Sequence, residues 1–196
     1  MLTIAGRRVE GAAGSDPVRN PARPDEIVHR APAASLEQLD EAVAAARRAQ
    51  PGWAALDFEA RLAAVTRAAA TASASASERD LPRLLTREHG KVLSESSFEV
   101  ATLGFMPATF ADAAREALTP RRTPEGMSEV VRVPLGVVAG VLPFNWPISV
   151  LGMKVVPALL AGNAVVVKVP PTCPGAVLEA AALIAEALPP GLLSAL

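Results

Sequence analysis

The segment from Gly136 to Lys168 constrains the fold more than any other part of the chain. Gly136 to Leu142 is a continuous apolar run, which is typical of a strand buried on both faces of a sheet. Ile148 to Leu160 follows with helical spacing, and Ala164 to Lys168 is a β-branched run that ends in a lysine. A strand, a helix and a second strand in this order predict a right-handed crossover between two parallel neighbours.

The same pattern begins again after Lys168. Pro174 to Leu188 predicts another helix, with Pro174 near its first turn, where a proline loses no hydrogen bond. Pro189-Pro190-Gly191 then turns toward a third strand, for which Leu192 to Leu196 remain. We therefore expect an α/β fold in which an N-terminal helical segment precedes the first βαβα half of a Rossmann-like parallel sheet, incomplete at the C-terminus.

The region before this sheet is predicted to be an extended arm followed by helices. Met1 to Arg30 is punctuated by Gly, Pro and Asn, which favours hairpins. Ser35 and Gln38 form a capping-box pattern, so a helix is predicted from there to Ala49, ended by Pro51-Gly52. The later helices are expected to begin near Asp57, to run from Leu81 to a stop at Gly90, and to run from Ser94 to Leu118 with Phe98, Leu103, Phe105 and Phe110 as apolar anchors.

A break rich in Pro, Gly and charge separates the two regions. It covers Thr119 to Glu129 and leads into a short predicted strand at Val130 to Val133. We accordingly divide the chain into residues 1–118 (arm and helices), 119–133 (hairpin) and 134–196 (first half of the sheet).

Composition excludes several classes of protein. Apolar residues make up 51% and charged residues 20% of the chain, which indicates a globular protein rather than a disordered one. A net charge of −1 without a basic stripe argues against nucleic-acid binding. Two histidines and one cysteine are too few for a zinc site or a disulfide framework, so no metal is predicted. The start of the chain does not resemble a signal peptide, so we expect a cytoplasmic protein.

A membrane span is the alternative interpretation of Trp146 to Val167, which is long enough and mostly apolar. Lys154 lies within this stretch, and Pro157 and Gly162 divide it into a helix, a turn and a strand. We therefore expect a buried core and no membrane partner.

Three polar residues could carry chemistry. Asn145 follows a predicted strand between two prolines, and its amide could stabilise an oxyanion or simply hydrogen-bond its own turn. Lys168 ends the next strand and could bind a ligand or remain a solvated charge. Lys154 lies in an apolar helix, where burial would depress its pKa unless the side chain reaches solvent.

The order of these motifs resembles the N-terminal portion of the NAD(P)-dependent aldehyde dehydrogenases. The resemblance rests on Pro143-Phe144-Asn145-Trp146-Pro147, on Lys154 to Leu159 followed by Gly162-Asn163, and on Val166-Val167-Lys168. Further similar segments are Asn20-Pro21-Ala22, Arg61-Leu62, Thr86 to Lys91 and Pro190-Gly191. The turn from Glu88 to Lys91 is nevertheless interpreted as a helix stop, and His29 and His89 as ordinary packing or surface residues.

The resemblance implies an oxidoreductase that oxidises an aldehyde to a carboxylic acid with NAD or NADP. It implies catalytic roles for Asn145 and Lys154, and it assigns cofactor binding to Leu142, Pro143, Phe144, Asn145, Lys168, Pro170 and Pro171. Many members have a glutamate where Pro171 stands, and that carboxylate repels a 2′-phosphate, so NADP should be tolerated or preferred.

The nucleophilic cysteine and the general-base glutamate of the family have no counterpart in residues 1–196. Cys173 lies at the cofactor-side turn with no neighbouring base and is not expected to be catalytic. We therefore expect the chain alone to be inactive. Its expected partners are an aldehyde in the complete enzyme and further copies of itself, because residues 119–133 resemble the family's oligomerisation hairpin. The alternative is a truncated interaction module that pairs with a full-length relative or a separate C-terminal half.

Overall fold

The computed structural model describes residues 1–196 and contains nine strands and six helices. The strands are β1 (Leu2–Ile4), β2 (Arg7–Val9), β3 (Ser15–Asn20), β4 (Arg23–Pro32), β5 (Arg121–Arg122), β6 (Glu129–Val130), β7 (Val137–Val141), β8 (Ala164–Lys168) and β9 (Leu193–Ala195). The helices are α1 (Leu36–Ala54), α2 (Phe58–Glu78), α3 (Leu81–His89), α4 (Leu93–Leu118), α5 (Pro147–Leu160) and α6 (Pro174–Glu186).

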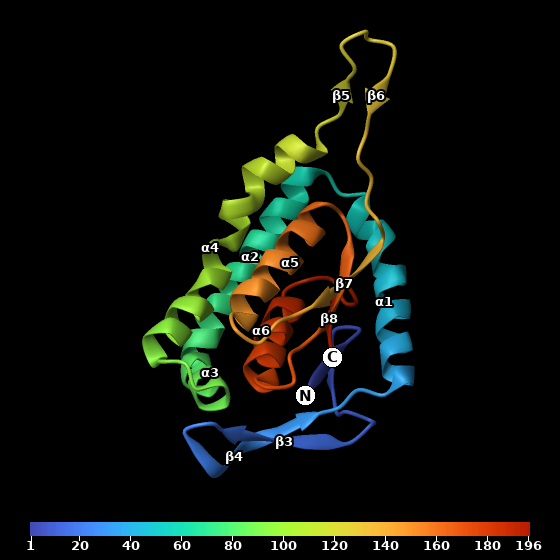
Figure 1. Ribbon diagram of the computed structural model, residues 1–196. Helices are drawn as coiled ribbons and strands as arrows, with labels where there is room; N and C mark the ends of the chain where they lie inside the picture. The colour runs from blue at the N-terminus through green and yellow to red at the C-terminus, as the bar shows by residue number, and fades with distance from the viewer.

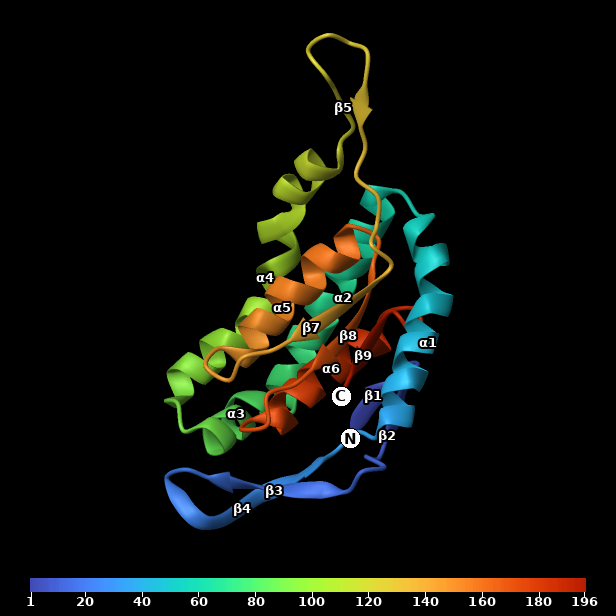
Figure 2. The same cartoon turned by 45° about the vertical axis from the view of Figure 1, so that its right-hand side comes forward.

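The central sheet has the strand order β2-β1-β9-β8-β7. Strands β7, β8 and β9 are parallel and are joined by the crossover helices α5 and α6, which confirms the predicted βαβα pattern. The first strand also joins this sheet: β1 lies antiparallel to β9, with Thr3 opposite Ala195. Both termini therefore lie close together in the middle of the molecule (Figures 1 and 2).

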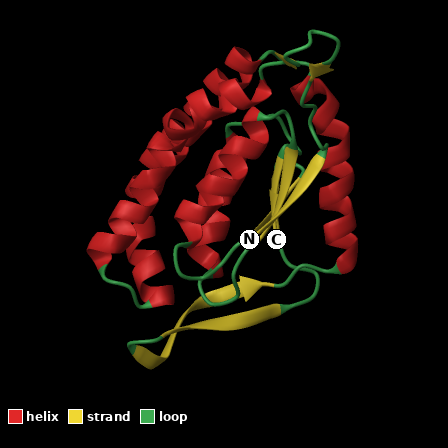
Figure 3. Cartoon of the chain, turned by 45° about the horizontal axis from the view of Figure 1, so that its top comes forward, coloured by secondary structure: helices red, strands yellow, loops and turns green.

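Helices cover the two faces of the sheet unequally. On one side α5 and α6 pack on the strands and are covered in turn by α2, α3 and α4. On the other side α1 packs alone across β8, β7 and β9 (Figure 3). The hairpin of β3 and β4 lies across one end of this assembly and contacts α3 and α6.

The predicted helix starts are confirmed by cap geometry. The Ser35 hydroxyl accepts a hydrogen bond from the main-chain amide of Gln38. Gln38 Oε1 in turn accepts from the main-chain amide of Ser35, which completes the capping box. Asp57 caps α2 through the Ala60 amide, and Gly90 ends α3 with a φ of 86°. The prediction that Pro51-Gly52 ends α1 was wrong: the helix continues through Pro51 to Ala54. 

Three further expectations are corrected by the structure. Phe98 and Phe105 are 59% and 47% exposed and do not anchor α4, whereas Leu103 is buried. Strand β7 is only partly buried, because it has a hydrogen-bonded neighbour on one side alone. The strand expected at Val130 to Val133 is shorter, since only Glu129–Val130 pairs with Arg121–Arg122.

The hairpin of β5 and β6 projects away from the rest of the molecule (Figures 1 and 2). A hydrogen bond of 2.9 Å, which the Thr123 main-chain amide donates to the Ser128 carbonyl, closes its turn. Apolar side chains on this hairpin and on the segment that follows it are exposed, namely Met127, Val130, Val131, Val133 and Leu135. The surface that they form has no partner within the chain.

Candidate functional site

The structure brings the ends of β7 and β8 to the same edge of the sheet. Val141 lies opposite Lys168 in the parallel ladder, and the Leu142 amide donates to the Lys168 carbonyl at 3.1 Å. Asn145 follows on the loop that enters α5, and both Asn145 and Lys168 are exposed. Because the carboxyl ends of parallel strands are where open α/β sheets bind ligands, this edge is the candidate site.

A cavity of about 520 Å³ opens beside this edge, on the face of the sheet covered by α1. Lys168 and Pro171 line it together with the small or apolar residues Gly140, Val141 and Val166. A concave apolar surface with few polar groups is the usual form of a small-molecule site. Asn145 and Lys154 do not line this cavity.

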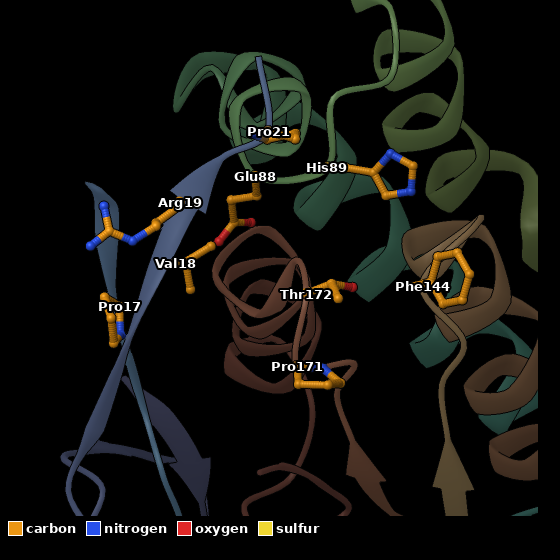
Figure 4. A pocket seen from close by; sticks show the side chains of 9 residues that line it. All are labelled: Pro17, Val18, Arg19, Pro21, Glu88, His89, Phe144, Pro171 and Thr172. Carbon is orange, nitrogen blue, oxygen red and sulfur yellow. The ribbon is translucent and has the colours of Figure 1, made fainter. Parts of the chain in front are cut away.

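A second cavity of about 450 Å³ lies on the other side of the Pro171 turn (Figure 4). Phe144 and Thr172 face it from the two strand-end loops, while Glu88 and His89 face it from the end of α3. Pro171 borders both cavities, so the turn after β8 separates them.

The loop that carries Asn145 is held by Lys91, in the connection between α3 and α4, and by Glu99 of α4, and the sequence analysis gave neither residue this role. Lys91 donates to the Asn145 main-chain carbonyl at 2.8 Å and forms an ion pair with Glu99. Glu99 accepts from the amides of Ile148 and Ser149, at 2.7 and 3.3 Å, at the start of α5. One signal for this was present: Glu99 is a carboxylate between Phe98 and Val100 in an otherwise apolar stretch.

Glu88 plays the corresponding part at the start of α6. Its two oxygens accept from the amides of Gly175 and Ala176, at 2.9 and 2.8 Å, and it is buried. His29 of β4 hydrogen-bonds the same carboxylate, which raises the pKa of His29. Gly90 does end α3 as predicted, but Glu88 before this stop caps α6, and Lys91 after it binds the Asn145 carbonyl and the Glu99 carboxylate.

The remaining predicted site residues fall into buried and exposed groups. Leu142 is 4% exposed and Pro170 is buried, so only their main-chain atoms can reach a ligand. Pro143 and Phe144 are exposed on the loop beside Asn145.

The expected burial of Lys154 was wrong. Lys154 is exposed on α5, and its stem reaches toward β7, where Lys154 Cδ would lie 3.9 Å from a Cβ placed on Gly140. The side chain therefore extends over the sheet while its ammonium group reaches solvent, which was the alternative interpretation.

Cys173 is fully buried at the start of α6, with its Sγ 3.7 Å from the Phe144 carbonyl. Burial raises the pKa of this thiol to about 12. The thiolate is the nucleophilic form of cysteine, so Cys173 stays protonated and unreactive near neutral pH.

The exposed edge thus offers an amide, an ammonium group and an apolar cavity. The Asn145 amide can donate to an oxyanion, and Lys168 can pair with a phosphate or a ribose hydroxyl as a point charge. The structure contains no group of three or more His, Cys, Asp or Glu side chains suited to a metal ion. None of its helices has both the length and the apolar character that crossing a bilayer requires.

Known proteins resemble this chain in sequence and in fold. N-succinylglutamate 5-semialdehyde dehydrogenase of Burkholderia lata is 39% identical over 194 residues, which cover 95% of this chain and 39% of the relative. An NADP dependent enzyme of E. coli matches the whole chain over 41% of its own length, with a TM-score of 0.88 and 28% identity. A point mutant of betaine aldehyde dehydrogenase from Staphylococcus aureus, solved with NAD⁺, matches with a TM-score of 0.86 and 27% identity over 40% of its length.

The chain thus spans about two fifths of the length of the proteins that it matches. The model of the family described as "Aldehyde dehydrogenase family" matches residues 9–196. With the fold and the strand-end site, this match shows that the chain belongs to the aldehyde dehydrogenase family.

Proposed function

We propose that this chain contributes the first half of the NAD(P) site and the oxyanion-binding amide of an enzyme that oxidises an aldehyde to a carboxylic acid. One observation carries the proposal: Asn145 and Lys168 are exposed at the same edge of two hydrogen-bonded parallel strands. The family and the cofactors named for two of its structural relatives support it.

The cofactor is proposed to lie along this edge. Lys168 would pair with a ribose hydroxyl or a phosphate, and the 520 Å³ cavity beside it would take the apolar part of the nucleotide. The main chain at Leu142 and Pro170 and the exposed Pro143 and Phe144 complete the proposed contacts. The residue at position 171 is a proline and places no carboxylate at this border of the cavity, which favours tolerance of, or preference for, the 2′-phosphate of NADP.

The chemical steps are divided between this chain and groups outside it. When bound, NAD(P) accepts the hydride. The Asn145 amide would stabilise the negative charge on the aldehyde oxygen after a thiolate attacks, and Lys154 would contribute positive charge from α5. The buried thiol of Cys173 cannot supply that thiolate, so we propose that residues 1–196 alone do not turn over an aldehyde.

Reconstitution tests this proposal. The chain is joined to, or expressed with, the catalytic portion of a relative, and NAD(P)H formation from an aldehyde is followed by its absorbance at about 340 nm. Activity is expected from the reconstituted enzyme and none from the chain alone. Asn145→Ala is expected to lower kcat by about 10²–10³, since it removes one oxyanion donor. Normal turnover of this variant would overturn the assignment.

A second candidate function is an interaction module, and one observation favours it. Strand β7 has no hydrogen-bonded partner on one side, and such an edge can accept a strand from another chain. Purification of the chain in a stable complex with a full-length relative or a separate C-terminal half, without aldehyde turnover by that complex, would favour this function over the first.

We further propose that the chain works in the cytoplasm as part of a homo-oligomer. In the division into residues 1–118, 119–133 and 134–196, the projecting hairpin is the middle part, and we assign oligomerisation to it. Its exposed apolar side chains support this role. Glu129→Pro within β6 would disturb the hairpin, and a fall in molecular mass in sedimentation experiments is expected. An unchanged mass would remove this role from residues 119–133.

A further inference from the structure

A buried ion pair lies behind the proposed oxyanion-binding loop. The side chains of Lys91 and Glu99 are only 5% and 0% exposed. Burying two charges is costly unless hydrogen bonds satisfy the remaining donors and acceptors. The groups that provide those bonds therefore show which part of the structure the pair holds in place.

The Glu99 carboxylate occupies the N-terminus of α5. Trp146, the N-cap residue, forms no side-chain cap, so the first amides of the helix have no partner on their own helix. Glu99 reaches across from α4 and accepts from Ile148 and Ser149 at 2.7 and 3.3 Å. Its negative charge also lies at the positive end of the helix dipole.

The Lys91 ammonium group holds the residue that comes just before this helix. It donates to the Asn145 carbonyl at 2.8 Å and lies 4.7 Å from the ring centroid of Trp146. The ion pair thus holds the main chain on both sides of Trp146, through the carbonyl of Asn145 and the amide of Ile148.

We propose that Lys91 and Glu99 are positioning residues that set the direction of the Asn145 side-chain amide. Fixing the carbonyl of Asn145 fixes the peptide plane that follows its Cα, and this limits where the side chain can point. A preorganised donor stabilises developing charge without reorganising during the reaction. This inference rests on the proposed oxyanion role of Asn145.

Another partly buried ion pair of the chain serves as a matched control. Arg8 of β2 pairs with Glu179 of α6 at 2.5 Å, and neither residue contacts the Asn145 loop. Loss of this pair should reduce stability without altering catalysis.

The test is a double-mutant cycle in the reconstituted dehydrogenase, using Lys91→Met, Asn145→Ala and the double variant. Lys91→Met is expected to lower kcat by about 10-fold or more, within the 10²–10³ that loss of one oxyanion donor causes. KM for NAD(P) is expected to change by less than about threefold, because Lys91 does not line the cavity beside Lys168 in which the nucleotide is proposed to lie. In the Asn145→Ala background the same substitution should have no further effect on kcat.

Two other variants separate positioning from general destabilisation. Lys91→Arg keeps the charge and should recover part of kcat, while Arg8→Met should leave kcat unchanged. Equal losses from Lys91→Met with and without Asn145 would overturn the proposal, as would a kcat within about twofold of wild type.

A measurement on the 196-residue chain distinguishes failure of this inference from failure of the proposed function. In ¹H–¹⁵N spectra, Lys91→Met should shift the Asn145 side-chain amide and the Ile148 main-chain amide, and Arg8→Met should shift neither. Absence of turnover in the wild-type reconstituted enzyme would count against the proposed function alone. Unshifted Asn145 signals in Lys91→Met would count against the positioning role.

Discussion

Arg61 Nε on α2 donates to the Leu160 carbonyl at 2.9 Å. A side chain of one helix thus satisfies a main-chain carbonyl at the C-terminal end of another, α5. Trp53 Nε1 does the same for the Leu159 carbonyl at 2.8 Å. Since Glu99 caps the other end, both termini of α5 are closed by side chains from the helical region. The crossover helix that follows Asn145 is therefore held at both ends by side chains from outside the sheet, in addition to its packing on β7 and β8.

Arg61→Met is expected to lower the free energy of unfolding by about 1–3 kcal/mol, because it leaves buried carbonyls without donors. Urea denaturation followed by circular dichroism measures the change. Arg67→Met, on an exposed position of the same helix, should change the unfolding free energy by less than about 0.5 kcal/mol. Equal midpoints for the two variants would contradict the capping role of Arg61.

Two glycines should respond to alanine with opposite signs. Gly162 has a φ of 86°, and an added Cβ would lie 2.9 Å from Pro134 Cγ, so Gly162→Ala should destabilise the chain by at least about 1 kcal/mol. Gly52 lies in α1 with open space around it, so Gly52→Ala should stabilise the chain by about 0.5–1 kcal/mol. Thermal melts of the two variants compare them directly, and shifts of the same sign would refute this account.

Cys173 should resist alkylation until the chain unfolds. Its thiol is fully buried and has a pKa of about 12, so little thiolate is present in the native state. We expect iodoacetamide to label Cys173 in urea but not in buffer. Thr66→Cys adds a thiol on the exposed face of α2 that should react in buffer, and mass spectrometry then counts one label per chain. Two labels in buffer would show that Cys173 is accessible.

The His29–Glu88 contact should make stability depend on pH. The contact raises the pKa of His29 in the folded chain above its unfolded value. Its stabilising contribution is therefore complete below the unfolded pKa and is lost as the pH rises through the folded pKa. The difference in unfolding free energy between wild type and His29→Gln should be largest below about pH 6.5, the ordinary pKa of histidine, and should shrink as the pH rises above it.

His89 also titrates, but its pKa is lowered, mainly by burial, so it changes the stability with pH in the opposite direction. Comparing wild type with His29→Gln at each pH cancels this contribution, because both proteins contain His89. A difference that stays constant with pH would show that protonated His29 does not stabilise the fold.

Local signals were sufficient to predict many elements of the fold. Ser35 and Asp57 cap their helices through neighbours three residues away, and Ala164 to Lys168 forms β8 with the predicted bounds. These features depend on short-range geometry or on an uninterrupted β-branched run. Pro51 was misread because a proline ends a helix only where its ring or missing amide conflicts with the chain, and α1 accommodates it close to its end.

Side-chain partners that are distant in sequence were not predictable in the same way. The region from Glu88 to Lys91 looked like a helix stop. Nothing local shows that Glu88 caps α6 or that Lys91 binds the Asn145 carbonyl, because both partners are more than fifty residues away in sequence. Lys154 was expected to be buried because its neighbours are apolar, yet its stem covers β7 while its charge reaches solvent. The roles of Asn145 and Lys168 remain proposals, although the structure places both at the expected edge.

The pairing of β1 with β9 has a consequence for synthesis of the protein on the ribosome. Thr3 meets Ala195 across the sheet, so β1, which pairs with β2 in a local hairpin, can join β9 only after the long segment between them has been synthesised. Contacts between such distant segments slow folding, because the loop must close before they can form. Until then Leu2 and Ile4, which are fully buried in the folded chain, lack the packing that forms when β1 joins β9. This interval is when a holding chaperone would have the apolar side chains of β1 to bind.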